Sequence, residues 1–143
     1  MVSDIGTRND AVAGIAATFA LWLKKAITEH WMMWRGDDEE KMEKLRILVH
    51  AICVELKIPC PKLELDHAVG DTLGVTYLDT GIIKLEKTSV VTTMHELAHW
   101  SLHWYGLENS EHNARLISLR SFFEVWPEKR GRSDILYQNE PGI

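Results

Sequence analysis

The spacing of hydrophobic positions changes along the chain, and the first pattern predicts a long buried helix. Asn9 or Asp10 can cap this helix, and the apolar pattern continues to about Trp34 before Gly36 interrupts it. Apolar residues occupy much of the circumference, which indicates a helix in the core or in an interface. Its end is rich in tryptophan and methionine, and this group could instead contact a partner or a second copy: Trp22, Trp31, Met32, Met33 and Trp34.

A second helix is expected after Gly36. Asp37 and Asp38 place acidic groups at its positively polarised start, and apolar residues then recur at helical spacing. Pro59 and Pro61 mark its end, because proline cannot continue a helix. The first two helices therefore span about 9–58.

The period then shortens to two residues, which is typical of strands. Leu63 and Leu65 alternate with polar neighbours, and β-rich runs at 74–78 and 82–85 flank a turn at 79–81. We expect three short strands in a small, mostly antiparallel sheet.

Helical spacing returns after the strands. Thr88 or Ser89 can cap a third helix through Tyr105, where Gly106 ends it.

A fourth helix begins with Asn109 or Ser110 as its cap and runs to about Trp126, before Pro127. The order of elements predicts one α+β domain over residues 1–143. Within it we expect the helices at 9–58, a catalytic core at 62–126 and an irregular C-terminal tail at 127–143.

Composition narrows the classes of function. The chain has 143 residues, 45% of them hydrophobic and 26% charged, as in an ordinary globular domain. The net charge of −5 does not favour general association with DNA or with anionic membranes. The short basic run Lys129, Arg130 and Arg132 is flanked by Glu128 and Asp134, which indicates a solvated tail.

Nothing in the pattern predicts membrane insertion or secretion. The apolar stretch Ala11–Leu23 is too short to cross a bilayer of about 30 Å as a helix, and its flanks do not resemble a signal peptide. Cys53 and Cys60 form neither a zinc ribbon nor a CxxC pair, and we expect free thiols in a reducing compartment. A cytoplasmic location is therefore expected.

The strongest chemical signal is the segment His95-Glu96-Leu97-Ala98-His99 on the third helix. At about 100° per residue, His99 lies about 40° from His95, and Glu96 lies about 100° from it. Most of the opposite arc is apolar. The helix therefore has one hydrophobic face and one face of imidazoles and a carboxylate.

This HExxH spacing suits a zinc site, because residues i and i+4 lie one turn apart and both imidazoles can bind one Zn²⁺ ion. Glu96 lies beside them without needing to be a ligand. It can serve as the general base that takes a proton from zinc-activated water. The alternative is a helix that carries surface histidines and binds no metal.

A catalytic zinc usually has three protein ligands, and the third is expected downstream. His103 lies about 12 Å from His95 along the helix axis, too far to share an ion with it. His112 is the preferred candidate, because it shares a stripe with Leu116, Leu119 and Phe123 that we expect to pack inward. Glu111 is the alternative third ligand, although it could simply form an i, i+4 ion pair with Arg115.

The chain resembles the SprT-like zinc metallopeptidases, which include SprT and the Spartan proteases. The likeness rests on Gly74-Val75-Thr76-Tyr77, on Gly81–Leu85, on the segment Thr92–Trp100 and on Glu111-His112-Asn113. It implies a zincin-like fold with His95, His99 and His112 as ligands and Glu96 as base. It also implies that strand 82–85 lies along the cleft, where a substrate peptide adds as a further strand.

A second resemblance is to the ImmA/IrrE-like metallopeptidases, whose third ligand is a glutamate on a later helix. Glu111 matches that pattern at an unusually short spacing from the HExxH motif. Both resemblances imply a helix–strand–helix core.

Three functions are compatible with these features. The preferred one is a zinc-dependent peptidase that acts on protein or peptide substrates, with Tyr77, His103, Tyr105 and Arg115 as candidate contacts to the substrate or the transition state. A second is a non-catalytic or regulatory zinc module that acts through protein–protein contacts of the first helix. A third, a DNA-repair protease, is not favoured by the net charge.

Overall fold

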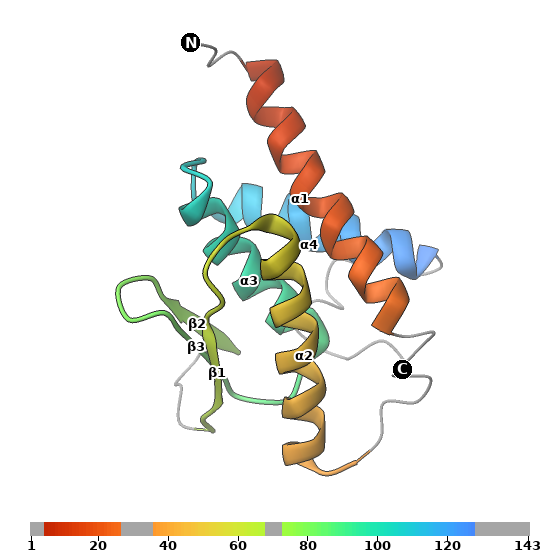
Figure 1. Cartoon of the computed structure of the whole chain (residues 1–143), viewed down its shortest axis with the longest axis vertical. Helices are drawn as coiled ribbons and strands as arrows, with labels where there is room; N and C mark the ends of the chain where they lie inside the picture. The colour runs from red at the N-terminus through yellow and green to blue at the C-terminus, as the bar shows by residue number, and fades with distance from the viewer. Residues whose placement is uncertain (1–4, 27–35, 68–72, 128–143) are drawn as a thin grey trace.

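The computed structural model describes residues 5–26, 36–67 and 73–127. It is an α+β structure with four helices and one three-stranded sheet (Figure 1). In chain order the elements are α1 (Ile5–Lys25), α2 (Asp38–Leu56), β1 (Lys62–Leu65), β2 (Gly74–Tyr77), β3 (Ile82–Leu85), α3 (Val90–Trp104) and α4 (Glu111–Val125). In the part of the chain that is described, no helix is both long and apolar enough to span a bilayer.

The first helix begins earlier than the capping residues predicted. α1 starts at Ile5, so Asn9 and Asp10 lie within it rather than before it. The expected continuation to Trp34, with the tryptophan and methionine group at 31–34, lies outside the described residues.

The second helix begins and ends close to the residues predicted for its start and end. Asp37 is the N-cap: its carboxylate accepts a hydrogen bond from Glu40 N–H, and the Glu40 side chain accepts one from Asp37 N–H. The helix ends at Lys57, which adopts the left-handed conformation with φ 59°.

The sheet is mixed rather than mostly antiparallel. β3 is its central strand, parallel to β1 and antiparallel to β2. The hairpin at 79–81 was predicted correctly, but β1 cannot pair with β2 because β3 lies between them. The strand at 82–85, which resemblance assigned to the cleft, is therefore enclosed by strands on both sides, and β2 is the edge strand that packs on α3.

One hydrophobic core joins all four helices to β1 and β3, and α3 lies at its centre. α1 packs mainly on α4, while α3 contacts α4 on one side and β2 on another (Figure 1). Almost every residue of α3 up to Leu102 is buried, including its polar ones. The two faces predicted from the helical wheel are thus both covered, one by the core and the other by β2 and α4.

β2 approaches α3 so closely that position 74 has no room for a side chain. A Cβ atom at Gly74 would lie 2.9 Å from Thr92 Cγ2 and 3.1 Å from Glu96 Cγ. The absence of a side chain at Gly74 therefore sets the distance between the edge strand and the central helix.

This contact predicts the effect of adding one methyl group. Gly74→Ala should destabilise the fold by about 1–3 kcal/mol, because strand and helix must separate. Gly14→Ala is the matched control: a Cβ there meets nothing within 4 Å, and alanine should stabilise the helix by up to about 1 kcal/mol. Urea unfolding measures both. Equal stability of the two variants would contradict the close approach of β2.

Candidate metal centre

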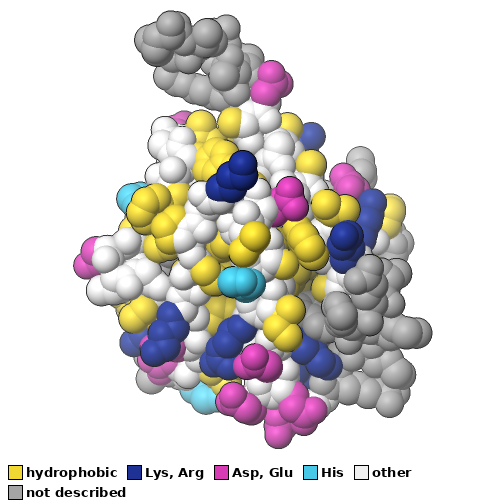
Figure 2. Space-filling view, in the orientation of Figure 1, with side chains coloured by type: hydrophobic (Ala, Val, Ile, Leu, Met, Phe, Trp, Pro, Cys, Tyr) yellow, Lys and Arg dark blue, Asp and Glu magenta, His cyan; other side chains and the backbone are white. Residues whose placement is uncertain are grey.

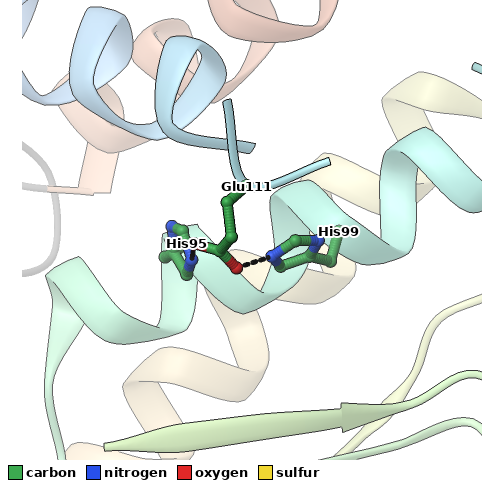
Figure 3. Close-up of side chains that lie close together, drawn as sticks. All are labelled: His95, His99 and Glu111. Atoms are coloured by element: carbon green, nitrogen blue, oxygen red, sulfur yellow. Dashed lines mark hydrogen bonds and ion pairs between the residues drawn. The ribbon is translucent and has the colours of Figure 1, made fainter. Parts of the chain in front are cut away.

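Two histidines on α3 and a glutamate on α4 converge on one point (Figure 3). The Nε2 atom of His95 lies 3.2 Å from Glu111 Oε2, and that of His99 lies 2.8 Å from Glu111 Oε1. One ligand atom from each residue can be chosen so that all three lie within 4.8 Å of one another. His95, His99 and Glu111 therefore form a group that could hold a metal ion.

The positions of these side chains follow from the caps of two helices. Ser89 caps α3 by accepting a hydrogen bond from Thr92 N–H, which fixes the start of the helix that carries both histidines. Gly106, with φ +66°, follows the end of α3, and Ser110 caps α4 by accepting from Asn113 N–H. Glu111 is thus the first residue of α4 and lies above the histidine pair.

The third member of the group is not the preferred His112. His112 is exposed and lies in a groove between α1 and α4, among Arg115, Leu116 and Leu119. Its expected stripe packs inward only in part: Leu116 is exposed, whereas Leu119 and Phe123 are half-buried against the cluster of Val91 and Phe122. The buried side of α4 consists instead of smaller residues with Ile117 and Phe122, at the spacing that includes position 111: Ala114, Ile117, Ser118, Ser121 and Phe122. The prediction followed the larger apolar side chains of one stripe, whereas the buried side of α4 also uses three small residues, Ala114, Ser118 and Ser121.

The hydrogen bonds of His99 favour a cation between the imidazole and Glu111. Nδ1 of His99 lies 2.6 Å from Asn109 Oδ1, an atom that can only accept. With the proton on Nδ1, the Nε2 lone pair of a neutral imidazole points at Glu111 Oε1, 2.8 Å away. Two such acceptors approach this closely only with positive charge between them, either a proton or a metal ion.

Electrostatics at the site favour the forms that bind metals. Burial lowers the pKa of His95 below its ordinary value, although the carboxylates of Glu111 and Glu96 oppose this effect. Burial raises the pKa of Glu111, but the hydrogen bond from His99 and the nearby imidazoles outweigh it, so the pKa is lowered overall. A neutral imidazole and an ionised carboxylate are the protonation states that a metal requires.

The two spacings between a histidine and the carboxylate are close to those around a tetrahedral ion. Ligands at about 2.0–2.1 Å from zinc lie about 3.3 Å from each other. The two histidine-to-carboxylate distances, 3.2 Å and 2.8 Å, are close to that value. Two imidazoles and one carboxylate are also a ligand set that catalytic zinc uses.

Glu96 lies beside this group but is held by the sheet. Its side chain is only 8% exposed, and Oε1 accepts a hydrogen bond of 2.8 Å from the hydroxyl of Thr76 on β2. Glu96, His99 and Glu111 line one cavity of about 260 Å³, and Gly74, Val75 and Thr76 form its opposite wall. The predicted base therefore faces the same space as His99 and Glu111.

The other candidate contacts have separate surroundings. His103 is exposed and lies against Trp100 and Trp104, with ring centroids 6.4 Å and 5.6 Å away. The Tyr105 hydroxyl donates to Leu56 C=O at 2.8 Å, which ties the end of α3 to α2.

Tyr77 and Arg115 lie on β2 and α4, the two elements that flank the cavity. Tyr77 is exposed at the end of β2, with Lys84 Nζ 5.7 Å from its ring centroid. Arg115 forms the expected i, i+4 pair with Glu111 at 3.8 Å. Of the four candidates, Arg115 is the one that contacts the His95–His99–Glu111 group directly.

Sequence reasoning gave no role to two residues that hold the site. Asn109 entered only as an alternative cap, yet its side chain binds His99. Thr76 entered only within a matching segment, yet it binds Glu96. Neither contact has a local signal, because each joins residues from different elements.

Comparison with protein-family models, with curated proteins and with solved structures gives no match to this chain. The case for a function therefore depends on the geometry of the site.

The surface adds no broad basic region on the face that Figure 2 shows. Acidic side chains gather there at the end of the molecule where α2 begins, and lysine and arginine side chains lie beside them. This arrangement does not favour electrostatic association with DNA through that face.

The placement of Glu111 predicts which variants lose metal. Glu111→Gln should weaken zinc binding by roughly 10-fold or more, because it removes a charged ligand. His112→Gln is the matched control on the adjacent residue and should bind zinc as the native chain does. Competition with a chromophoric chelator measures both affinities. A larger loss of zinc affinity in His112→Gln than in Glu111→Gln would instead identify His112 as the third ligand.

Proposed function

We propose that this chain is a zinc-dependent metallopeptidase that hydrolyses peptide bonds of protein substrates, with His95, His99 and Glu111 as ligands and Glu96 as the general base. The observation that carries the proposal is the position of Glu96. It is a buried carboxylate that shares a cavity with His99 and Glu111, follows His95 directly in the sequence, and does not belong to the group of candidate ligands. A purely structural metal site would not need a second carboxylate held beside it.

The choice of zinc follows from the ligand types. A zinc ion with an open coordination position would lower the pKa of its bound water to about 7 and polarise a substrate carbonyl. Two imidazoles and a carboxylate leave such a position, since zinc is usually four-coordinate.

The chain's own groups would then move the proton. Glu96 accepts it from the attacking water and delivers it to the nitrogen of the leaving amine. Its burial suits this task, because few solvent molecules compete for the carboxylate. The Thr76 hydroxyl keeps one carboxylate oxygen in place and leaves the other available to the proton.

Among the described residues no strand pairs with the outer edge of β2, and this edge supports a peptide as substrate. Glu86 N–H donates to Leu73 C=O at 2.9 Å, which sets the alternation of hydrogen bonds between β2 and β3. By that alternation the backbone N–H and C=O groups of Gly74 and Thr76 point away from β3, and both residues line the cavity. An extended peptide could add there as a strand, beside β2 rather than beside β3 as resemblance implied.

Glu111 as the third ligand supports the ImmA/IrrE-like resemblance, whose third ligand is a glutamate. It does not support the SprT-like ligand set, which would require His112. Activity on crosslinks between protein and DNA is therefore not part of the proposal.

Replacing the base tests the proposal. In zinc-loaded protein, Glu96→Gln should reduce cleavage of labelled casein by roughly 100-fold or more, because proton transfer is lost. Zinc content and melting temperature should remain close to those of the native chain.

Glu55→Gln, an exposed residue of α2, is the matched control and should cleave normally. Zinc-loaded protein that cleaves equally well with and without the Glu96 carboxylate would contradict the proposal. Zinc-loaded protein that cleaves no unfolded substrate would favour the non-catalytic module instead.

A further inference from the structure

Strand β2 contacts the Glu96 side chain at two points, the methylene Cγ and the carboxylate. The backbone at Gly74 lies against the methylene groups of Glu96, because a Cβ atom added at position 74 would be 3.1 Å from Glu96 Cγ. The Thr76 hydroxyl lies 2.8 Å from Glu96 Oε1 and 3.1 Å from the Glu96 carbonyl oxygen. Positions 74 and 76 share one face of the strand, so both contacts come from the side that packs on α3.

These contacts matter because the Glu96 carboxylate lies beside the candidate ligands. It is adjacent in sequence to His95 and lines the same cavity as His99 and Glu111. A carboxylate there that turned toward the ion would become a fourth protein ligand. It would then fill the open position that a catalytic metal needs and could no longer act as a base.

From this geometry we infer that Thr76 is a positioning residue that holds Glu96 out of the metal's coordination sphere, and so keeps an acidic residue beside the ion as a base. The inference rests on the proposed function. Gly74 contributes by allowing β2 to come close enough for the hydroxyl of Thr76 to reach Oε1.

The placement of Thr76 on the edge strand has a further consequence. The backbone of residue 76 faces the side on which a substrate peptide would add, while its side chain holds the base. Thr76 would therefore contact both the bound peptide, through its backbone, and Glu96, through its side chain. Substrate position and base position are set by the same strand.

Cobalt substitution gives a readout that does not depend on turnover. The visible spectrum of Co²⁺ changes when a carboxylate replaces water as the fourth ligand. Thr76→Val removes the hydroxyl at nearly constant shape, so Glu96 should become free to ligate and the Co²⁺ spectrum should differ from that of the native chain. With zinc, kcat should fall by roughly 10- to 100-fold, with a smaller change in KM.

Thr76→Ser is the matched control, because it keeps the hydroxyl, and it should restore both the Co²⁺ spectrum and kcat. Thr76→Ala serves the same purpose as Thr76→Val if the valine variant does not fold. In a Glu96→Ala background, Thr76→Val should leave the Co²⁺ spectrum unchanged, because the group that it releases is absent.

The possible failures are separable. If the native chain binds Co²⁺ and cleaves substrate, but Thr76→Val keeps the native spectrum and kcat, the role of Thr76 is overturned and the proposed function stands. If the native chain binds no Co²⁺ at all, the proposed function fails, and the inference fails with it. An equal loss of kcat in Thr76→Val and Thr76→Ser would also overturn the inference, because the serine variant keeps the hydroxyl.

Discussion

The burial of α3 on both its apolar and its polar face is the constraint on which the rest of the structure depends. Buried polar groups need partners, and α3 carries several between Thr92 and Ser101. Some are satisfied within the helix, such as Ser101, whose hydroxyl donates to Leu97 C=O. Those that face the cavity find partners on other elements: Glu96 on β2, and His99 near the start of α4. The two walls of the candidate site are thus the two elements that cover the polar face of α3.

The choice between Glu111 and His112 follows from the same packing. Successive residues of a helix point about 100° apart, so the first turn of α4 can direct only one of the two toward α3. The side of α4 that packs inward carries Ala114, Ser118 and Ser121, whose small size lets the helices approach closely. Glu111 extends that side toward the histidines, and His112 lies with the larger residues along the groove facing α1.

The sequence allowed the order of elements, several helix caps and the histidine pair to be predicted, because each depends on residues close together in the chain. Asp37, Ser89 and Ser110 are caps that act within one turn. The parallel pairing of β1 with β3 was not predictable in the same way, since no local pattern specifies which strand becomes central. Hydrophobic spacing favoured His112 over Glu111 as third ligand, but the structure brings Glu111 to the histidine pair, because position 111 continues the buried side of α4 that carries Ala114, Ser118 and Ser121. Thr76 and Asn109 were missed for a related reason: their contacts exist only after β2 and α4 have docked on α3.

The central claim is that His95, His99 and Glu111 together bind one metal ion. Anomalous diffraction at the zinc absorption edge, from crystals of the native chain grown with zinc, tests it most directly. The account predicts one strong peak bonded to Nε2 of both histidines and to the carboxylate of Glu111, with Glu96 close by but not bonded to the ion. A peak coordinated by His112, or zinc-loaded crystals with no peak at the histidine pair, would contradict it.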